Sequence, residues 1–136
     1  MPNAAAMASR RESALAGEPR VLVVEDESLV CLLIEETVAQ LGWQVVGPAA
    51  RLGRALELVR TAAYDCAVLD VNLRGEPVYP VAEILAEQGV PFLFLTGYSR
   101  AEIDERFRGQ PMIRKPFTGA VLYQSLRRLR EQVSAR

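Results

Sequence analysis

Five short apolar runs alternate with segments of helical period along this chain, and that alternation constrains the fold most. The runs are rich in β-branched or large apolar side chains, which predicts strands at residues 21–24, 44–47, 66–70, 92–96 and 111–113. Strands that alternate with helices are typical of a parallel sheet, because parallel strands need a crossover connection. The pattern therefore predicts one α/β domain built from five strand-helix units.

The segments between the runs carry apolar residues three and four positions apart, which is the spacing of one helix face. In the first and last of these helices the residues are Val30, Leu33, Ile34, Val38 and Leu41, then Leu122, Leu126, Leu129 and Val133. A polar helix is expected at residues 100–108, where only Ile103 and Phe107 would point inward. We expect that helix to be the most weakly anchored of the five.

The composition limits what the chain is expected to bind. Its 136 residues fit one domain, and 16 basic against 17 acidic residues give a net charge of -1. Such a balance provides no field that would hold a nucleic acid. No apolar run is long enough to cross a bilayer, so no membrane contact is expected. Residues 1–18 are small and polar and are expected to form a flexible tail, which leaves residues 19–136 for the domain.

The cysteines favour a cytoplasmic protein. Cys31 and Cys66 lie in apolar runs without CxxC spacing, and the chain has no histidine to complete a zinc site. Both are therefore expected to be reduced core residues, as is usual in the cytosol.

Polar residues end the predicted strands, at the sheet edge where open parallel sheets bind ligands. They are Glu25, Asp26 and Glu27 after the first strand, Asp70 in the third, Thr96 in the fourth, and Lys115 with Pro116 after the fifth. Each alone has an ordinary structural explanation, such as a solvated helix start or a turn. Asp70 is the exception, because it directly follows four apolar residues, where an unpaired charge is costly. The joint placement favours a functional site.

Crowded carboxylates at that edge predict a hard divalent cation, which would relieve their mutual repulsion. Mg²⁺ is the expected ion and Mn²⁺ the alternative. With the ion in place, Asp70 has the character of a nucleophile for aspartyl-phosphate chemistry, while Thr96 offers a hydroxyl and Lys115 a point charge for the phosphoryl group.

These residues resemble, in type, order and spacing, the signature of bacterial response-regulator receiver domains of the CheY-like kind, over about residues 20–133. The resemblance implies a doubly wound, flavodoxin-like (βα)5 sandwich, with strand order 2-1-3-4-5 and helices on both faces. It implies that Asp70 accepts a phosphoryl group, that Glu25, Asp26, Asp70 and the Asn72 backbone carbonyl hold the metal, and that the Lys115-Pro116 bond is cis.

The same resemblance implies a switch, in which Thr96 and Lys115 sense the phosphoryl group. The fourth and fifth strands and the helix between them would then shift and change protein contacts. Met112 stands where many receivers have a switch aromatic. Residues 91–98 instead resemble the motif of FATGUY-type single-domain regulators, with Tyr98 as the local aromatic, acting either as a gate or as a half-buried lid. Thr96, Tyr98, Met112 and Pro116 are the candidate switch residues.

The resemblance also implies the partners. A chain without histidine receives its phosphoryl group from a histidine kinase or a histidine phosphotransfer protein. It would catalyse only its own phosphorylation and dephosphorylation, and so would not be an enzyme. With no output domain after the last helix, it is expected to act through a protein contact, or as a phosphate sink, shuttle or kinase modulator.

Three other functions are weighed against this one. A Mg²⁺-dependent aspartyl-phosphate phosphatase would need a second aspartate at position 72, where Asn72 stands. A flavodoxin-like cofactor binder would need a phosphate-binding loop after the first strand, where the residues are acidic. A receiver that works only as a phosphorylation-independent module would have no need of Asp26, Asp70, Thr96 and Lys115 together.

Overall fold

The computed structural model describes residues 18–134 of the chain. The tail predicted at residues 1–18 therefore lies, apart from Glu18, outside the described residues. No helix among the described residues is long and apolar enough to span a membrane.

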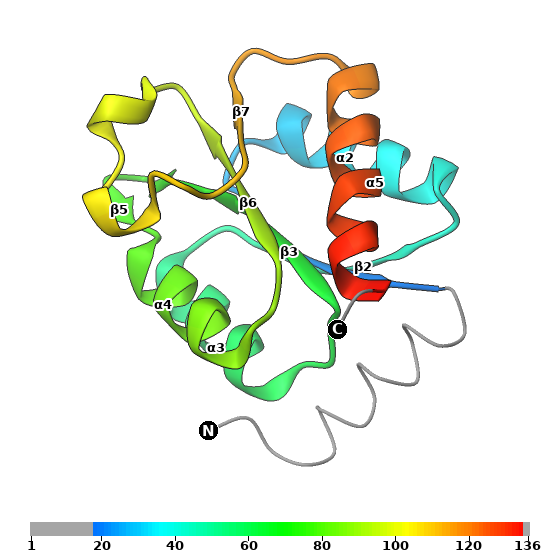
Figure 1. Ribbon diagram of the computed structural model, residues 1–136, viewed down its shortest axis with the longest axis horizontal. Coiled ribbons are helices and arrows are strands. Elements are labelled where there is room, and N and C mark those ends of the chain that lie inside the picture. Colours follow the sequence, from blue (N-terminus) through cyan, green and yellow to red (C-terminus); the bar gives the residue numbers. More distant parts are fainter. Residues whose placement is uncertain (1–17, 135–136) are drawn as a thin grey trace.

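A five-stranded parallel sheet forms the centre of the domain (Figure 1). Its strands are β1 (Arg20–Val24), β2 (Gln44–Ala49), β3 (Cys66–Asp70), β6 (Phe92–Thr96) and β7 (Met112–Arg114). They lie in the order β2-β1-β3-β6-β7, with all neighbours parallel, so the predicted strand order 2-1-3-4-5 is confirmed. The bounds of β3 and β6 agree with the prediction, and β2 runs two residues beyond it.

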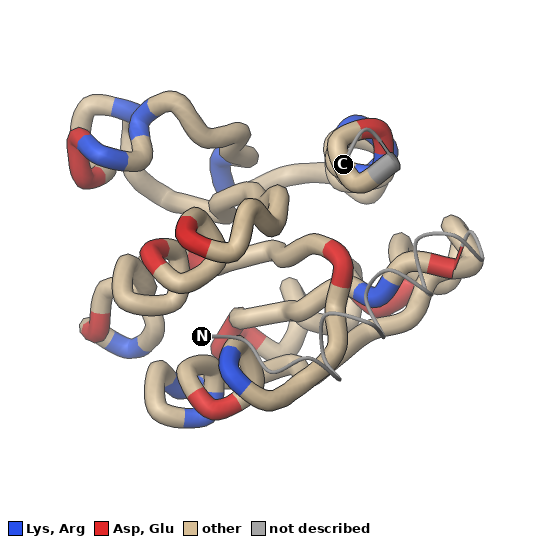
Figure 2. Tube along the Cα trace, turned by 60° about the horizontal axis from the view of Figure 1, so that its bottom comes forward, with Lys and Arg blue, Asp and Glu red and all other residues tan. Residues whose placement is uncertain are grey.

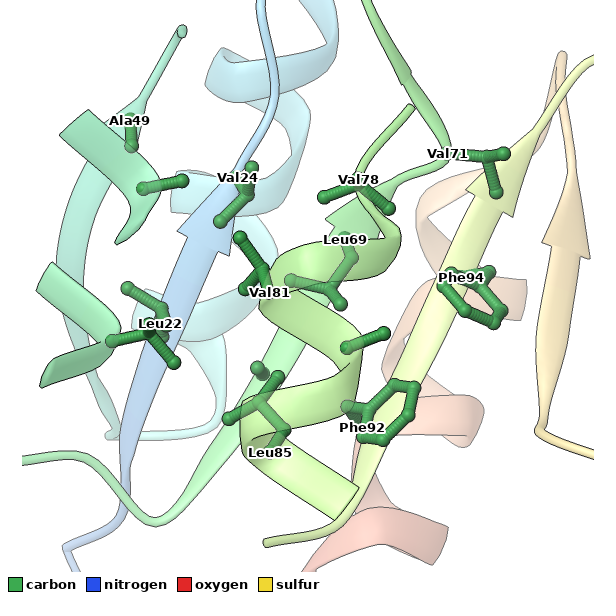
Figure 3. Close-up of a cluster of buried hydrophobic side chains, with 14 of the residues drawn as sticks. Leu22, Val24, Ala49, Leu69, Val71, Val78, Val81, Leu85, Phe92 and Phe94 are labelled. Carbon is green, nitrogen blue, oxygen red and sulfur yellow. The ribbon is translucent and has the colours of Figure 1, made fainter. Parts of the chain in front are cut away.

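Two pairs of helices cover the two faces of the sheet (Figure 1). On one face α2 (Ser28–Gln40) packs beside α5 (Gly119–Ser134), and on the other α3 (Leu52–Thr61) packs beside α4 (Tyr79–Gln88). Successive strand residues point to opposite faces, so Leu22 and Leu69 join the core under α3 and α4 while Val23 and Val68 join the other. Figure 3 shows the first of these cores. The predicted doubly wound sandwich is confirmed.

The prediction of a helix at residues 100–108 is wrong. Two short 3-10 helices stand there, η1 (Arg100–Glu102) and η2 (Glu105–Phe107). Polar side chains explain the difference, because they hydrogen-bond to nearby backbone groups and so compete with a continuous helix. Ser99 and Glu102 form a capping box at η1, and the Asp104 side chain accepts from the Arg106 amide at the start of η2.

The segment between β6 and β7 is held by two buried side chains and by arginine hydrogen bonds to its backbone. Its two predicted inward residues, Ile103 and Phe107, are buried. Outside them, the Arg108 guanidinium donates to the Ile103 and Ala101 carbonyl oxygens, each at 3.0 Å. The Arg108 side chain thus bonds to two backbone carbonyl oxygens of the segment.

A small hairpin occupies the loop that follows β3. It consists of β4 (Asn72–Leu73) and β5 (Glu76–Pro77), paired antiparallel. The two residues between them, Arg74 and Gly75, have positive φ angles of 51° and 88°. Both residues therefore sit in the left-handed region that two-residue hairpin turns require.

The cysteine prediction holds for one of the two residues. Cys66 is fully buried in the core, whereas Cys31 is only half-buried. Burial and the neighbouring Glu25 carboxylate raise the pKa of the Cys31 thiol to about 11, so Cys31 stays protonated at neutral pH.

Gly47 in β2 is expected to tolerate no side chain. Its φ is +98°, and a Cβ atom there would lie 2.9 Å from the Ala49 amide nitrogen and 3.0 Å from the Val23 carbonyl oxygen. Gly47→Ala should therefore cost about 2–4 kcal/mol of unfolding free energy in urea denaturation, since left-handed strain and a backbone clash add. Gly42→Ala, at φ +76° but in open space, is the matched control and should cost about 1 kcal/mol. Equal losses would refute the clash.

Candidate functional site

Side chains from four strand ends meet at the carboxyl edge of the sheet. Glu25, Asp26 and Glu27 follow β1, Asp70 ends β3, Thr96 ends β6 and Lys115 follows β7. One cavity of about 710 Å³ collects most of them. Its polar lining includes Asp26, Glu27, Asp70, Thr96 and Lys115, and its rim includes the apolar Leu29, Val30, Leu33 and Phe117. The predicted residues are thus brought together, although neither Glu25 nor Met112 belongs to the cavity lining.

Four carboxylates form the acidic part of the site. Each of Glu25, Asp26, Glu27 and Asp70 offers an oxygen, and these oxygens all lie within 4.8 Å of one another. Glu27 was missed as a site residue, although its place in the acidic triplet was a usable signal. Elsewhere, basic and acidic residues are mixed around the described chain (Figure 2), so this cluster is a local concentration of charge.

Glu25 is the most deeply buried of these carboxylates, with no exposed surface. Its Oε2 accepts hydrogen bonds from the Asp26 and Glu27 amides, both at 3.0 Å, which fixes the orientation of the side chain. Its Oε1 lies 2.8 Å from the Lys115 ammonium but has no hydrogen bond of good geometry. That oxygen therefore keeps an acceptor capacity that no hydrogen bond uses.

Lys115 is the single lysine of the chain; the other fifteen basic residues are arginines. Its ammonium lies 2.8 Å from Glu25, 3.0 Å from Glu27 and 3.4 Å from Asp70. Burial by itself would lower the pKa of Lys115, but the close contact with Glu25, the hydrogen bond to Glu27 and the charge of Asp70 outweigh it and raise the pKa above its usual range. Lys115 is therefore a permanent cation among three carboxylates.

Asp70 is only 6% exposed. Burial, followed by the charge of Glu25, raises the pKa of its carboxyl to about 8, and Lys115 offsets only part of this rise. One ammonium is thus too little positive charge for the cluster. The donor set is all oxygen, as hard divalent cations such as Mg²⁺ prefer. The residues present fit such an ion.

Thr96 lies at the back of the cavity and is buried. Its hydroxyl oxygen accepts a hydrogen bond of 2.8 Å from the Tyr98 amide, which leaves the hydroxyl hydrogen to be donated elsewhere. The Lys115-Pro116 bond is cis, as expected, and Pro116 lines the cavity beside the lysine.

Tyr98 and Asn72 both line the cavity and contact each other. The Asn72 amide group donates to the Tyr98 hydroxyl at 2.9 Å, and its carbonyl oxygen accepts from the Gly75 amide at 2.6 Å. Tyr98 lines the cavity and is 37% exposed. Met112 is half-buried and packs against the core under α3 and α4.

Arg74 is a second residue that sequence reasoning missed. It lines the cavity from the turn of the β4-β5 hairpin, and its Nε lies 4.0 Å from the Asp26 carboxylate. Strands of two residues leave no periodic signal in a sequence. The approach of Arg74 to the site is therefore visible only in three dimensions.

The chain matches the family model of the response regulator receiver domain over residues 21–127. It is 30% identical over 103 residues to the transcriptional regulatory protein PdtaR of Mycobacterium tuberculosis, which covers 73% of this chain and 50% of PdtaR. The chain thus spans about half the length of the curated relatives it matches.

Solved structures of receiver proteins resemble it along most of its length. SdrG from Sphingomonas melonis Fr1 is 40% identical with a TM-score of 0.74, covering 83% of this chain and 97% of SdrG. The BeF3-activated conformation of SdrG from Pseudomonas melonis Fr1 is also 40% identical, with a TM-score of 0.69 and coverage of 81% and 94%. The receiver domain of PhyR from Erythrobacter litoralis is 28% identical, with a TM-score of 0.73 and coverage of 85% and 92%.

Proposed function

The chain belongs to the response regulator receiver domain family of two-component systems, and from this premise we propose that it is a phosphorylation switch whose acceptor is Asp70. One observation carries the proposal. The Asp70 carboxylate is buried at the end of β3, opens into the cavity, and has the Lys115 ammonium 3.4 Å away. It is thus placed to attack a phosphorus atom while a cation faces the incoming charge.

The transfer step follows from these positions. An oxygen of Asp70 attacks the phosphorus of a phosphohistidine, the phosphorus–nitrogen bond breaks, and the bonding electrons pass to the imidazole, which takes a proton from water. The product is an acyl phosphate on Asp70. Because the chain has no histidine, the donor lies outside it, on a histidine kinase or a histidine phosphotransfer protein.

The metal is proposed to be Mg²⁺, with Mn²⁺ as the alternative. Asp26, Asp70 and the Asn72 backbone carbonyl would hold it, with Glu25 behind them. Their fit rests on the clustered carboxylate oxygens and on the buried Glu25 Oε1 without a hydrogen bond. When bound, a divalent ion neutralises charge on phosphoryl oxygens. Thr96 and Lys115 would orient the phosphoryl group, and the ammonium of Lys115 would offset part of its charge.

The switch is proposed to start at Lys115 and Thr96. A phosphoryl group on Asp70 would draw the ammonium away from Glu27 and would accept from the Thr96 hydroxyl. Both residues lie at the ends of strands that flank residues 97–111, a segment that holds two short 3-10 helices. We expect that segment, with β7 and Pro116, to move and to change the surface offered to a protein partner. Tyr98 would move with that segment, and Met112 would move as part of β7.

The wider biological role rests on the family. We propose that residues 19–136 form a cytoplasmic receiver that binds neither nucleic acid nor membrane and that turns over only its own phosphoryl group. A role as a phosphate sink, shuttle or kinase modulator would use the same site. A phosphatase of small esters is the weaker candidate, since Asn72 takes the place of its acid-base aspartate.

Beryllium fluoride, which mimics a phosphoryl group on a carboxylate, tests this function. With Mg²⁺ it should shift backbone amide signals of the wild type near Asp70, Thr96 and Lys115 and across residues 97–111, measured by NMR. Asp70→Asn should show none of these shifts, while Glu57→Gln, which changes an exposed carboxylate in α3, should respond like the wild type. The proposal would be lost if Asp70→Asn responded fully or if the wild type did not respond.

A further inference from the structure

Arg74 has a backbone conformation that its side chain does not favour. Among residues 18–134 it is the one residue other than glycine with a positive φ, 51°. It holds the first place of a two-residue hairpin turn, where Asn, Asp or Gly are preferred because a larger side chain crowds the backbone. The hairpin thus forces an arginine into a position that costs stability, and strain of this kind points to a role for the side chain.

The charges of the site show where that side chain is needed. Among the described residues, the Lys115 ammonium pairs with Glu25, Glu27 and Asp70, which are three of the four clustered carboxylates. The fourth, Asp26, has the Arg74 guanidinium 4.0 Å away instead. The two cations thus divide the four carboxylates between them, three contacting Lys115 and one contacting Arg74.

The contact between Arg74 and Asp26 is of a kind that can be displaced. At 4.0 Å it is an ion pair without a hydrogen bond, and the Arg74 side chain is 54% exposed against 16% for Asp26. A half-exposed pair of this geometry contributes little to stability. It does, however, place a positive charge where a metal ligand is proposed.

We infer that Arg74 is a tethered counter-cation for Asp26, which competes with the divalent ion for that carboxylate and lowers the metal affinity of the site. Arg74 is a positioning residue, because it acts through Asp26. This inference rests on the proposed function and deepens it, since it assigns the control of metal binding to the β4-β5 hairpin.

Metal titration of Arg74 variants tests the inference. Arg74→Gln should bind Mg²⁺ about two- to fivefold more tightly than the wild type at low salt, the size expected for losing one half-exposed charge contact. The gain should shrink as salt is raised. Arg74→Lys should stay close to the wild type, because it keeps the charge. Affinities are read by calorimetry with Mg²⁺ and by electron paramagnetic resonance with Mn²⁺, without any phosphoryl donor.

Two further variants separate the causes. Arg54→Gln removes an equal charge that pairs with Glu57 in α3, and its metal affinity should not change. Arg74→Gly should match Arg74→Gln in metal affinity but exceed it in unfolding free energy, because glycine relieves the positive φ. If Arg54→Gln tightened binding as much as Arg74→Gln, the effect would come from net charge and the inference would fail.

Asp26→Asn distinguishes failure of this inference from failure of the proposed function. If Asp26→Asn weakens Mg²⁺ binding while Arg74→Gln leaves it unchanged, Arg74 is no competitor and the metal site stands. If neither the wild type nor Arg74→Gln binds Mg²⁺ or Mn²⁺, the inference and the proposed metal site are both wrong.

Discussion

Asp70→Asn is expected to abolish phosphoryl transfer to the chain without harming its fold. Asparagine has nearly the same shape as aspartate but lacks the nucleophilic oxygen, so no acyl phosphate forms. It also removes a carboxyl group whose ionisation is opposed by burial and by the charge of Glu25, so the unfolding free energy should stay the same or rise. Intact-mass measurement after incubation with a phosphoramidate donor and Mg²⁺ should show one added phosphoryl group in the wild type and none in the variant.

Two controls make that result specific. Asp104→Asn should gain the phosphoryl group as the wild type does, because Asp104 caps η2, outside the cavity lining. Asp26→Asn should be phosphorylated slowly while keeping Asp70 as acceptor. If Asp70→Asn were modified at the wild-type rate, the acceptor would be another residue and the account of the site would be wrong.

Lys115→Met is expected to be the most destabilising change within the site. The ammonium is the cation shared by Glu25, Glu27 and Asp70, and Glu25 is fully buried. Removing one partner from a buried ion pair costs about 3–5 kcal/mol, because the other charge is left without compensation. Urea denaturation in chelator-treated buffer measures the loss. Adding Glu25→Gln to Lys115→Met should recover a large part of it.

Lys115→Arg tests whether charge alone is enough. A guanidinium is planar and wide, whereas an ammonium is a compact point charge that fits among three oxygens. We expect this variant to lie between wild type and Lys115→Met in stability and to lose most of its response to beryllium fluoride. A loss below about 1 kcal/mol for Lys115→Met would contradict the account, since that is the size of an exposed pair.

The strands were the most predictable part of the fold. β3 and β6 are continuous apolar runs with every residue buried, so composition alone marks their bounds. The helix predicted at residues 100–108 was wrong for the opposite reason, because that segment is mostly polar. It holds two buried apolar side chains among capping and charged residues, and the local hydrogen bonds of those polar groups outweigh a weak helical period.

Residue type and place were predictable in the site, and the pairing of side chains was not. The strand order brings Asp26, Asp70, Thr96 and Lys115 to one edge of the sheet. The alternation of strands and helices along the sequence is enough to predict this. That Lys115 contacts Glu27 depends on side-chain distances, although its standing as the single lysine among fifteen arginines was a readable signal. The approach of Arg74 depends on a turn that only the folded chain forms.

The central claim is that Asp70 carries the phosphoryl group. Borohydride reduces an acyl phosphate to the alcohol and so turns a phosphorylated aspartate into homoserine, which peptide mass spectrometry locates. After reaction of the wild type with a phosphohistidine donor and Mg²⁺, the account predicts homoserine at position 70 and at no other aspartate. Homoserine at position 26, or a folded and metal-loaded protein with none at all, would contradict it.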